Sequence, residues 1–328
     1  PKKELSYSER RKLTQFPELS ASSIFDGEFM EEFEKYALDQ FAFRDNFRSF
    51  KAFFDLVLLN KSDNNDIYVI NNNVFKMEYP LDINSVYNMS EKMNKIYDLY
   101  LKNMNVFYSI IPDKNYFVAK KNEYLAIDYS ELEKIMNDNV KNMTYIDIMD
   151  CLQLNDYYRT DTHWKQESLG KVVKTISNKM AFKIDLNNII YTEKTYHPFY
   201  GVYYGQSALN IEPDLLTYKT SENIQNAIVH NLENPIGEDA ASLIYDEQML
   251  GKMDSYNVFL SGGTPLITIE NSNNKTGKEL IIFRDSFASS LAPLLIEEYS
   301  KITLIDLRYI GYESIDDFVK FDEQDVLF

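Results

Sequence analysis

The order strand, tight turn, helix, strand near the end of the chain constrains the fold more than any other feature. Residues 279–283 form a short apolar run, residues 287–295 carry apolar side chains at helical spacing, and residues 302–305 form a second apolar run. This order predicts a β–α–β unit of an open α/β sheet. Ser286 falls in the turn after the first strand, at the sheet edge where such folds place their chemistry.

Ser286 is therefore a candidate nucleophile. A serine at this turn has backbone N–H groups and the positive end of the following helix nearby, and both favour a developing oxyanion. The simpler interpretation is that Asp285 or Ser286 caps the helix, which is the commoner use of these residues.

A second feature is an Asp and a His two positions apart, at Asp161 and His163, followed by the only Trp of the chain, Trp164. In an extended or turning segment, residues i and i+2 point the same way and can serve one site. A carboxylate beside an imidazole is the pair that activates a hydroxyl nucleophile. By itself this pair also fits a helix-capping Asp161 and a structural His163.

Together, the Asp161-x-His163-Trp164 motif and Arg284-Asp285-Ser286-Phe287 resemble the DHHW proteins, relatives of the alginate O-acetyltransferases in the SGNH-hydrolase-like group. The resemblance extends to residues 6–17, 25–27, 39–45, 203–205 and 261–263. Two positions depart from the pattern. Thr162 stands where the family has its first His, and Thr264 stands where many relatives have an Asn that donates to the oxyanion.

The resemblance implies a Ser–His–Asp triad of Ser286, His163 and Asp161, in a circularly permuted order with the Asp-x-His ahead of the Ser. It also implies a three-layer αβα doubly wound, mostly parallel sheet of the SGNH-hydrolase-like kind. The backbone N–H of Ser286 is one expected oxyanion donor. Further candidates for oxyanion or substrate contacts are Gly205, Gly262 and Tyr204.

The expected function is an extracytoplasmic acyltransferase that O-acetylates a cell-envelope or exported polysaccharide through an acyl-serine intermediate. A carbohydrate esterase of the same fold, or an inactive glycan-binding protein, are the alternatives. The expected partners are a polysaccharide acceptor and an acyl donor, supplied by a membrane acyltransferase. The resemblance also implies export, or anchoring by an N-terminal segment that precedes Pro1, whereas no apolar run in this chain approaches the ~18 residues of a membrane helix.

Composition excludes several other classes of protein. A net charge of −17 argues against nucleic acid or an anionic membrane surface as the main partner. The single cysteine, Cys151, excludes an internal disulfide framework. We expect no cofactor and no metal, because three scattered His and one Cys form no zinc motif, and no phosphate-binding glycine motif is present.

The 328 residues are expected to divide into an N-terminal arm and helical extension over 1–60 and an α/β domain over 61–328. Within that domain, an irregular insertion is expected around 185–275. Apolar patterns predict strands at 66–70, 106–112 and 143–148 and helices at 83–104, 130–140 and 169–180. The alternation of strands and helices is typical of an α/β sheet.

Two aromatic-rich regions allow a structural or a binding interpretation. Residues 25–37 and 47–58 repeat aromatic and aliphatic side chains at helical spacing, which favours core packing over a sugar platform. The many Tyr residues around 185–275 fit either binding loops or a β-rich insertion in which they pack.

The residues that flank the two motifs carry their own expectations. At least one of Arg159 and Arg284 is expected to be structural and to pair with a carboxylate such as Asp285. Trp164 is expected to face inward and fix the backbone of the Asp161–His163 turn, with a sugar-stacking role as the alternative.

Overall fold

The computed structural model describes residues 2–182, 184, 186–232 and 243–328, which group into two compact units. Unit 1 comprises Pro1–Met77, Arg159–Thr162 and Tyr200–Asp214. Unit 2 comprises Glu78–Tyr158, His163–Phe199 and Leu215–Phe328. The short segment Arg159–Thr162 thus interrupts unit 2 immediately before His163.

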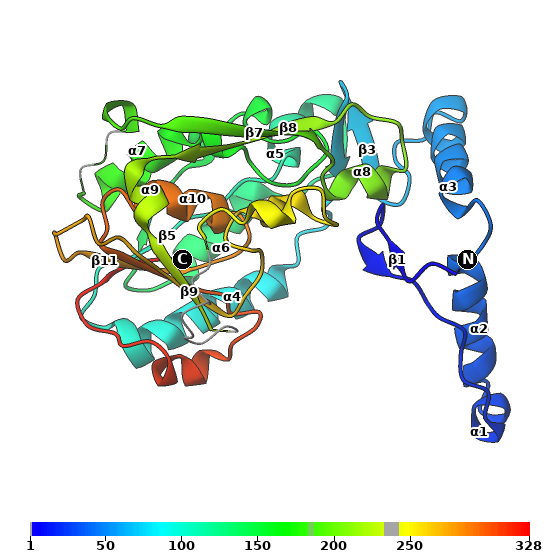
Figure 1. Cartoon of the computed structure of the whole chain (residues 1–328), viewed down its shortest axis with the longest axis horizontal. Helices are drawn as coiled ribbons and strands as arrows, with labels where there is room; N and C mark the ends of the chain where they lie inside the picture. Colours follow the sequence, from blue (N-terminus) through cyan, green and yellow to red (C-terminus); the bar gives the residue numbers. More distant parts are fainter. Residues whose placement is uncertain (1, 183, 185, 233–242) are drawn as a thin grey trace. The chain divides into compact units, whose positions relative to one another are not determined.

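Unit 2 is built on a seven-stranded sheet (Figure 1). Its strands, in spatial order, are β6 (Thr144–Tyr145), β5 (Val106–Tyr108), β13 (Asp325–Leu327), β11 (Glu279–Phe283), β12 (Lys301–Ile305), β10 (Leu266–Glu270) and β9 (Ile228–Asn231). The first five strands run parallel. At one edge, β10 pairs antiparallel with β12, and β9 pairs antiparallel with β10. The predicted α/β class with a mostly parallel sheet is confirmed.

The central strand β11 is apolar on both sides because each face of the sheet is covered. Leu280 and Ile282 belong to one core cluster, and Ile281 and Phe283 belong to another. This division follows from the alternation of side chains along a strand. Both faces of β11 are therefore buried, as the continuous apolar run predicts.

The two core clusters contain side chains from different helices. Helices α7 (Gly170–Lys179) and α10 (Ala288–Leu295) contribute to the cluster of Leu280. Helix α4 (Ile83–Ile96) and its π-helical continuation η2 (Tyr97–Leu101) contribute Ile96 and Leu101 to the cluster of Ile281. In Figure 1, α4 and α10 accordingly lie on different sides of the sheet. The other α-helices of unit 2 are α5 (Asn115–Val118), α6 (Tyr129–Asn139) and α9 (Glu222–Asn226).

Unit 1 contains two small antiparallel hairpins and four α-helices. The hairpins are β1 (Leu5–Ser6) with β2 (Arg11–Lys12), and β3 (Ile67–Ile70) with β4 (Asn73–Lys76). The helices are α1 (Ala21–Phe25), α2 (Glu28–Asp39), α3 (Arg44–Phe53), which continues as the π-helix η1 (Phe54–Leu58), and α8 (Val202–Ser207). A small core of Ile67, Val74 and Ile211 joins the second hairpin to the segment around α8.

One expectation about an individual element is wrong. The strand predicted at 66–70 exists, but it pairs with β4 in a two-stranded sheet of unit 1 and takes no part in the large sheet. Its apolar pattern identified a strand but carried no information on its partner. In the described part of the region 185–275, β7 (Thr192–Phe199) pairs with β8 (Asp214–Thr220), and β9 and β10 belong to the large sheet. These strands favour the β-rich alternative for this region, while the expected insertion itself stays a prediction. The predicted division at residue 60 stays a prediction.

The expectation that the N-terminal aromatic residues pack in a core is also wrong. Phe25 is 89% exposed, Phe43 is 77% exposed and Phe50 is 64% exposed. Helix α1 has no buried residue, and Ala52 is the only buried residue of α3. Helical spacing of apolar side chains predicts an amphipathic helix, but it does not provide the surface that would cover the apolar face.

No helix in the described parts of the chain combines the length and the apolar character that crossing a bilayer demands.

Candidate active site

Ser286 occupies the turn between β11 and α10, as the sequence predicts. The strand ladder continues for one bond beyond β11, because the Arg284 N–H donates to the Ile305 carbonyl at 2.8 Å. Asp285 then turns the chain, since its Oδ1 accepts the Phe287 N–H at 2.9 Å. Ser286 is half-buried, with its hydroxyl at the start of the helical segment. A rigid strand and a buried helix therefore fix the serine from both sides.

His163 lies within hydrogen-bond distance of this serine. Its Nε2 is 2.8 Å from Ser286 Oγ, and only 8% of the histidine is exposed. The backbone around it is a tight reversal, in which Tyr157 bridges Trp164 and the Tyr158 N–H donates to the His163 carbonyl at 3.1 Å. An imidazole at this distance can take the serine proton, which is the geometry that a general base requires.

Trp164 is fully buried next to the histidine, so the predicted inward orientation is confirmed. Its Nε1–H donates to Ser290 Oγ at 2.9 Å and also lies 3.2 Å from the Phe287 carbonyl. The indole therefore ties the His163 segment to the first turns of α10, beyond the serine. A buried indole with no exposed surface cannot stack on a sugar.

Asp161 belongs to unit 1 and is fully buried there. Its Oδ2 accepts the Val202 N–H at 2.8 Å and lies 4.0 Å from the Arg10 guanidinium. The backbone of Gly201 approaches so closely that a Cβ on it would lie 2.3 Å from the Asp161 Cβ. Asp161 is therefore held in one place by unit 1, and a single residue, Thr162, separates it from His163 in the chain.

Arg159, two residues before Asp161, is structural. Its Nε lies 3.5 Å from Asp214 Oδ1, and its Nη2 donates to the Pro213 carbonyl at 2.6 Å. The prediction that one of the two flanking arginines pairs with a carboxylate is confirmed by this contact.

Arg284 is buried but uses neutral acceptors rather than Asp285. Its Nη1 donates to Ser289 Oγ at 2.7 Å, and its Nη2 donates to the Gly262 carbonyl at 3.0 Å and the Thr264 carbonyl at 3.3 Å. Burial lowers the pKa of this guanidinium, while the nearby Asp306 acts in the opposite direction. Arg284 therefore anchors the Gly262–Thr264 loop to the strand that carries Ser286.

Solved structures with this fold are known, although no family model and no curated protein sequence matches the chain. A DHHW family protein from Eubacterium siraeum superposes with a TM-score of 0.66 at 20% sequence identity, over 81% of this chain and 91% of that protein. The chain has the fold of a DHHW family protein. PatB1 from Bacillus cereus superposes with a TM-score of 0.61 at 19% identity, over 80% of this chain and 96% of PatB1. A second structure of PatB1, with a sulfonyl adduct, gives the same TM-score at 17% identity, over 80% of this chain and 95% of PatB1.

The other predicted site residues lie in different surroundings. Gly262 adopts a left-handed φ of 89°, and a Cβ there would lie 2.7 Å from the Asn257 side chain, so this position needs glycine. Gly205 lies in unit 1, where the Ser8 carbonyl occupies the space of a Cβ. Tyr204 is also in unit 1, with its ring centroid 4.3 Å from that of Tyr200.

Sequence reasoning missed Tyr256, whose ring stacks on the His163 imidazole. The ring centroids are 3.8 Å apart and the planes differ by 7°. Tyr256 lies in the short 3₁₀ helix η9 (Ser255–Val258), inside the region expected to be irregular. A single tyrosine in an aperiodic segment gives no sequence signal for a contact with a distant histidine.

The described residues contain no group of three or more His, Cys, Asp or Glu side chains that could hold a metal ion.

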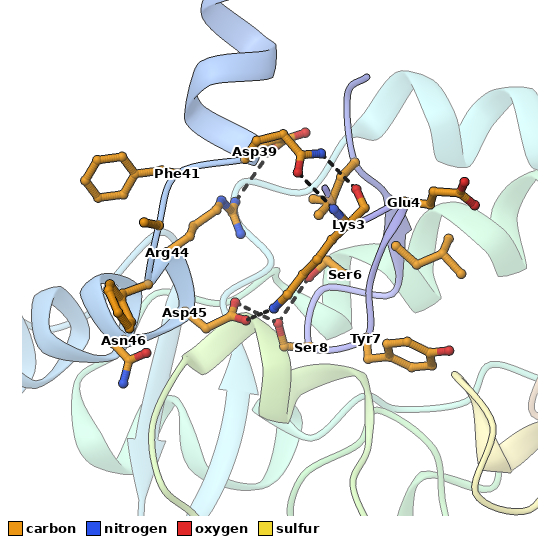
Figure 2. A pocket seen from close by; sticks show the side chains of 15 residues that line it. Lys3, Glu4, Ser6, Tyr7, Ser8, Asp39, Phe41, Arg44, Asp45 and Asn46 are labelled. Atoms are coloured by element: carbon orange, nitrogen blue, oxygen red, sulfur yellow. Dashed lines mark hydrogen bonds and ion pairs between the residues drawn. The ribbon is translucent and has the colours of Figure 1, made fainter. Parts of the chain in front are cut away.

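A cavity of about 990 Å³ lies in unit 1 between the first hairpin and the connection of α2 to α3 (Figure 2). Figure 2 shows Lys3 beside Asp45, whose carboxylate is 3.9 Å from the lysine nitrogen. Arg44 pairs with Glu9, and Asp39 pairs with Arg11. These charged groups hold the hairpin to the helices, and neither His163 nor Ser286 lines the cavity.

Proposed function

We propose that the protein is a Ser–His–Asp acyltransferase that moves an acetyl group to a hydroxyl of a cell-envelope or exported polysaccharide. The observation that carries this proposal is the 2.8 Å distance between His163 Nε2 and Ser286 Oγ at the turn between a buried parallel strand and a buried helix. A base and a hydroxyl at hydrogen-bond distance are the signature of an activated nucleophile. The proposal includes the three-layer, circularly permuted SGNH-hydrolase-like form of the fold.

In the first half-reaction, His163 Nε2 takes the proton of Ser286 Oγ as this oxygen bonds to the acyl carbon of a donor ester. The tetrahedral oxyanion receives hydrogen bonds from the Ser286 N–H and from a second N–H, with Gly262 and Gly205 as candidates. Each such donor lowers a barrier of this kind by about 3 kcal/mol. The donor alkoxide then leaves with the proton from His163, and the acyl group stays on Ser286.

In the second half-reaction, the acceptor hydroxyl gives its proton to His163 and attacks the acyl-serine. The ester to Ser286 breaks, and Oγ recovers a proton from the imidazolium, so the enzyme returns to its starting state. Asp161 is the proposed partner that orients the imidazole and stabilises its cationic form. Its place two residues before His163 in the chain supports this role.

The proposed setting is extracytoplasmic, with an acyl donor supplied by a membrane acyltransferase. The large negative charge supports a neutral acceptor, because it disfavours anionic polymers. If water replaces the acceptor hydroxyl, the same first half-reaction makes the protein an esterase.

A chromogenic acetyl ester, offered with and without a panel of neutral oligosaccharides, tests the proposal. We expect turnover that falls by roughly 10³-fold or more in Ser286→Ala. The control Ser300→Ala, which changes a serine bonded to the Lys278 carbonyl, should turn over the ester normally. Acetylated oligosaccharide in the products identifies a transferase, whereas free acetate alone identifies the esterase. If Ser286→Ala turns over the ester as fast as wild type, both the transferase and the esterase with Ser286 as nucleophile are refuted.

A further inference from the structure

The contact between His163 and Tyr256 is an unusual one for two neutral rings. Their centroids are 3.8 Å apart with nearly parallel planes, and both residues are buried. Neutral aromatic pairs prefer edge-to-face or offset arrangements over close face-to-face stacking. A cation over the face of a phenol ring is, in contrast, attracted by the negative charge of that face. The geometry therefore suits the protonated imidazole that forms when His163 takes the proton of Ser286.

The phenol is locked in this position by its hydroxyl. Tyr256 Oη donates to Ser290 Oγ at 2.9 Å. Ser290 Oγ also accepts the Trp164 Nε1–H at 2.9 Å. The hydroxyl proton of Ser290 is donated to the Phe287 carbonyl at 3.2 Å. A serine hydroxyl has one donor and two acceptor sites, so these three bonds fill its capacity. Ser290 is fully buried, and water cannot substitute for any of these partners.

Ser290 thereby connects the three groups that position His163 next to Ser286: helix α10, the indole of Trp164 and the ring of Tyr256. It lies on α10 four residues after Ser286, it binds the indole of the residue that follows His163, and it binds the ring stacked on His163. The backbone of Tyr256 is fixed as well, because its N–H donates to Asp254 Oδ1 at 3.0 Å.

We propose that Tyr256 is a positioning residue for His163, and that its ring face stabilises the imidazolium formed during acyl transfer while Ser290 holds the ring in place. This role rests on the proposed function, since it requires His163 to act as the base. It operates in the chemical step and not in the binding of substrate. Loss of the ring should therefore lower kcat and leave KM unchanged.

The test compares four proteins: wild type, Tyr256→Phe, Tyr256→Leu and the control Tyr299→Leu. Tyr299 is also buried, in the same unit, and its hydroxyl donates to Asp325 Oδ2 at 3.0 Å. The control therefore loses a buried phenol of the same kind away from the histidine. Turnover of an acetyl ester gives kcat and KM, and the rate of covalent labelling by a small sulfonyl fluoride reports the reactivity of Ser286.

We expect Tyr256→Leu to lose about 10- to 30-fold in kcat, with KM within about twofold of wild type. Labelling of Ser286 should slow by a similar factor. Tyr256→Phe keeps the ring but loses the bond to Ser290, so its kcat should lie between those of Tyr256→Leu and wild type. Tyr299→Leu should lower the thermal midpoint with kcat nearly unchanged. If Tyr256→Leu fails to fold, Tyr256→Met replaces it, because methionine adapts to the vacated volume.

The proposal is overturned if the leucine variant keeps the kcat of the control, if the loss appears in KM, or if Tyr256→Phe loses as much as Tyr256→Leu. A wild-type protein whose Ser286 is neither acylated nor sulfonylated would instead overturn the proposed function, and this role with it. If wild type is labelled at Ser286 and Tyr256→Leu is labelled at the same rate, the role of Tyr256 is overturned and the proposed function stands.

Discussion

The indole of Trp164 and the imidazole of His163 are neighbours in the chain and take opposite directions. His163 reaches Ser286, while Trp164 is fully buried and bonded to Ser290. This divergence is expected of adjacent residues in an extended segment. The tryptophan therefore supports the backbone of the histidine, and its contribution is to stability and to the precision of the site.

Trp164→Ala should lower the free energy of unfolding by about 3–5 kcal/mol, because it removes a large buried aromatic side chain. It should also lower ester turnover. Because Trp164 is the only Trp, wild-type fluorescence reports this residue alone. We expect blue-shifted emission that acrylamide quenches poorly and that oligosaccharides leave unchanged. Exposed, freely quenched emission that shifts with glycan would instead support a sugar-stacking role.

The loop Gly262–Thr264 depends on one buried cation at the end of β11. The planar guanidinium of Arg284 reaches Ser289 with one nitrogen and the loop carbonyls with another. A lysine ammonium is a compact group that cannot span these directions together. Arg284 thus holds the Gly262–Thr264 loop against the end of β11.

Arg284→Lys should cost about 1–3 kcal/mol in urea unfolding, since at least one buried carbonyl loses its donor. Arg308→Lys is the matched control. The side chain of Arg308 is exposed and lies 2.6 Å from the buried carboxylate of Asp306, and a lysine at this position keeps a positive charge near that carboxylate, so this variant should cost less than Arg284→Lys. Equal losses in the two variants would contradict the anchoring role of Arg284.

The N-terminal hairpin is attached to the end of α2 through Asp39. This carboxylate accepts bonds from Arg11 at 2.6 and 2.8 Å and from the Thr14 N–H at 2.8 Å. The bonds with Arg11 hold the pKa of Asp39 far below its usual range, although burial acts to raise it. The stabilisation is then complete above the unfolded pKa of about 3.9 and is lost as the pH falls toward the folded value.

We therefore expect hydrogen-exchange protection of residues 4–14 to be weaker in Asp39→Asn than in wild type at pH 7. The difference should shrink as the pH falls below about 4, after correction for intrinsic exchange rates. Asp26→Asn, at an exposed carboxylate, is the control and should match wild type throughout. A difference that persists unchanged at low pH would show that the ion pair is not its cause.

The elements that sequence predicts well are those with a strong period and a covered surface. The run at 279–283 and the helix after it appear as β11 and α10 because both are apolar and bounded by polar turns. The pairing of His163 with Ser286 can be predicted from sequence because each residue lies in a local motif that indicates a catalytic role. The stacking of Tyr256 on His163 cannot be predicted in this way, because it depends on how segments that are distant in the sequence fold together. The strand at 66–70 was misplaced for the same reason.

For the chain as a whole, an acidic surface coexists with exposed aromatic side chains in residues 16–59. The net charge is −17, yet large apolar side chains of the first three helices and of the connection between α2 and α3 remain open to solvent, among them Phe25, Phe43 and Phe50. Charge keeps such a chain in solution through repulsion, while exposed apolar area binds apolar molecules.

We predict that the native protein binds the dye ANS and that the triple variant Phe25→Ser, Phe43→Ser, Phe50→Ser binds much less of it. Ester turnover and the thermal midpoint should change little, because the three side chains are largely exposed. The matched control replaces buried Phe199 by Ser, which should lower the midpoint instead. Equal dye fluorescence from the triple variant and wild type would place the binding elsewhere.

Covalent labelling shows whether Ser286 is a nucleophile activated by His163. Sulfonyl reagents react with activated hydroxyl nucleophiles. We predict that a small sulfonyl fluoride adds one group to the wild-type protein and that peptide mass spectrometry locates it on Ser286. Ser286→Ala should remain unlabelled, and His163→Ala should label far more slowly. A label of equal yield in Ser286→Ala, or one located at another residue, would contradict the claim.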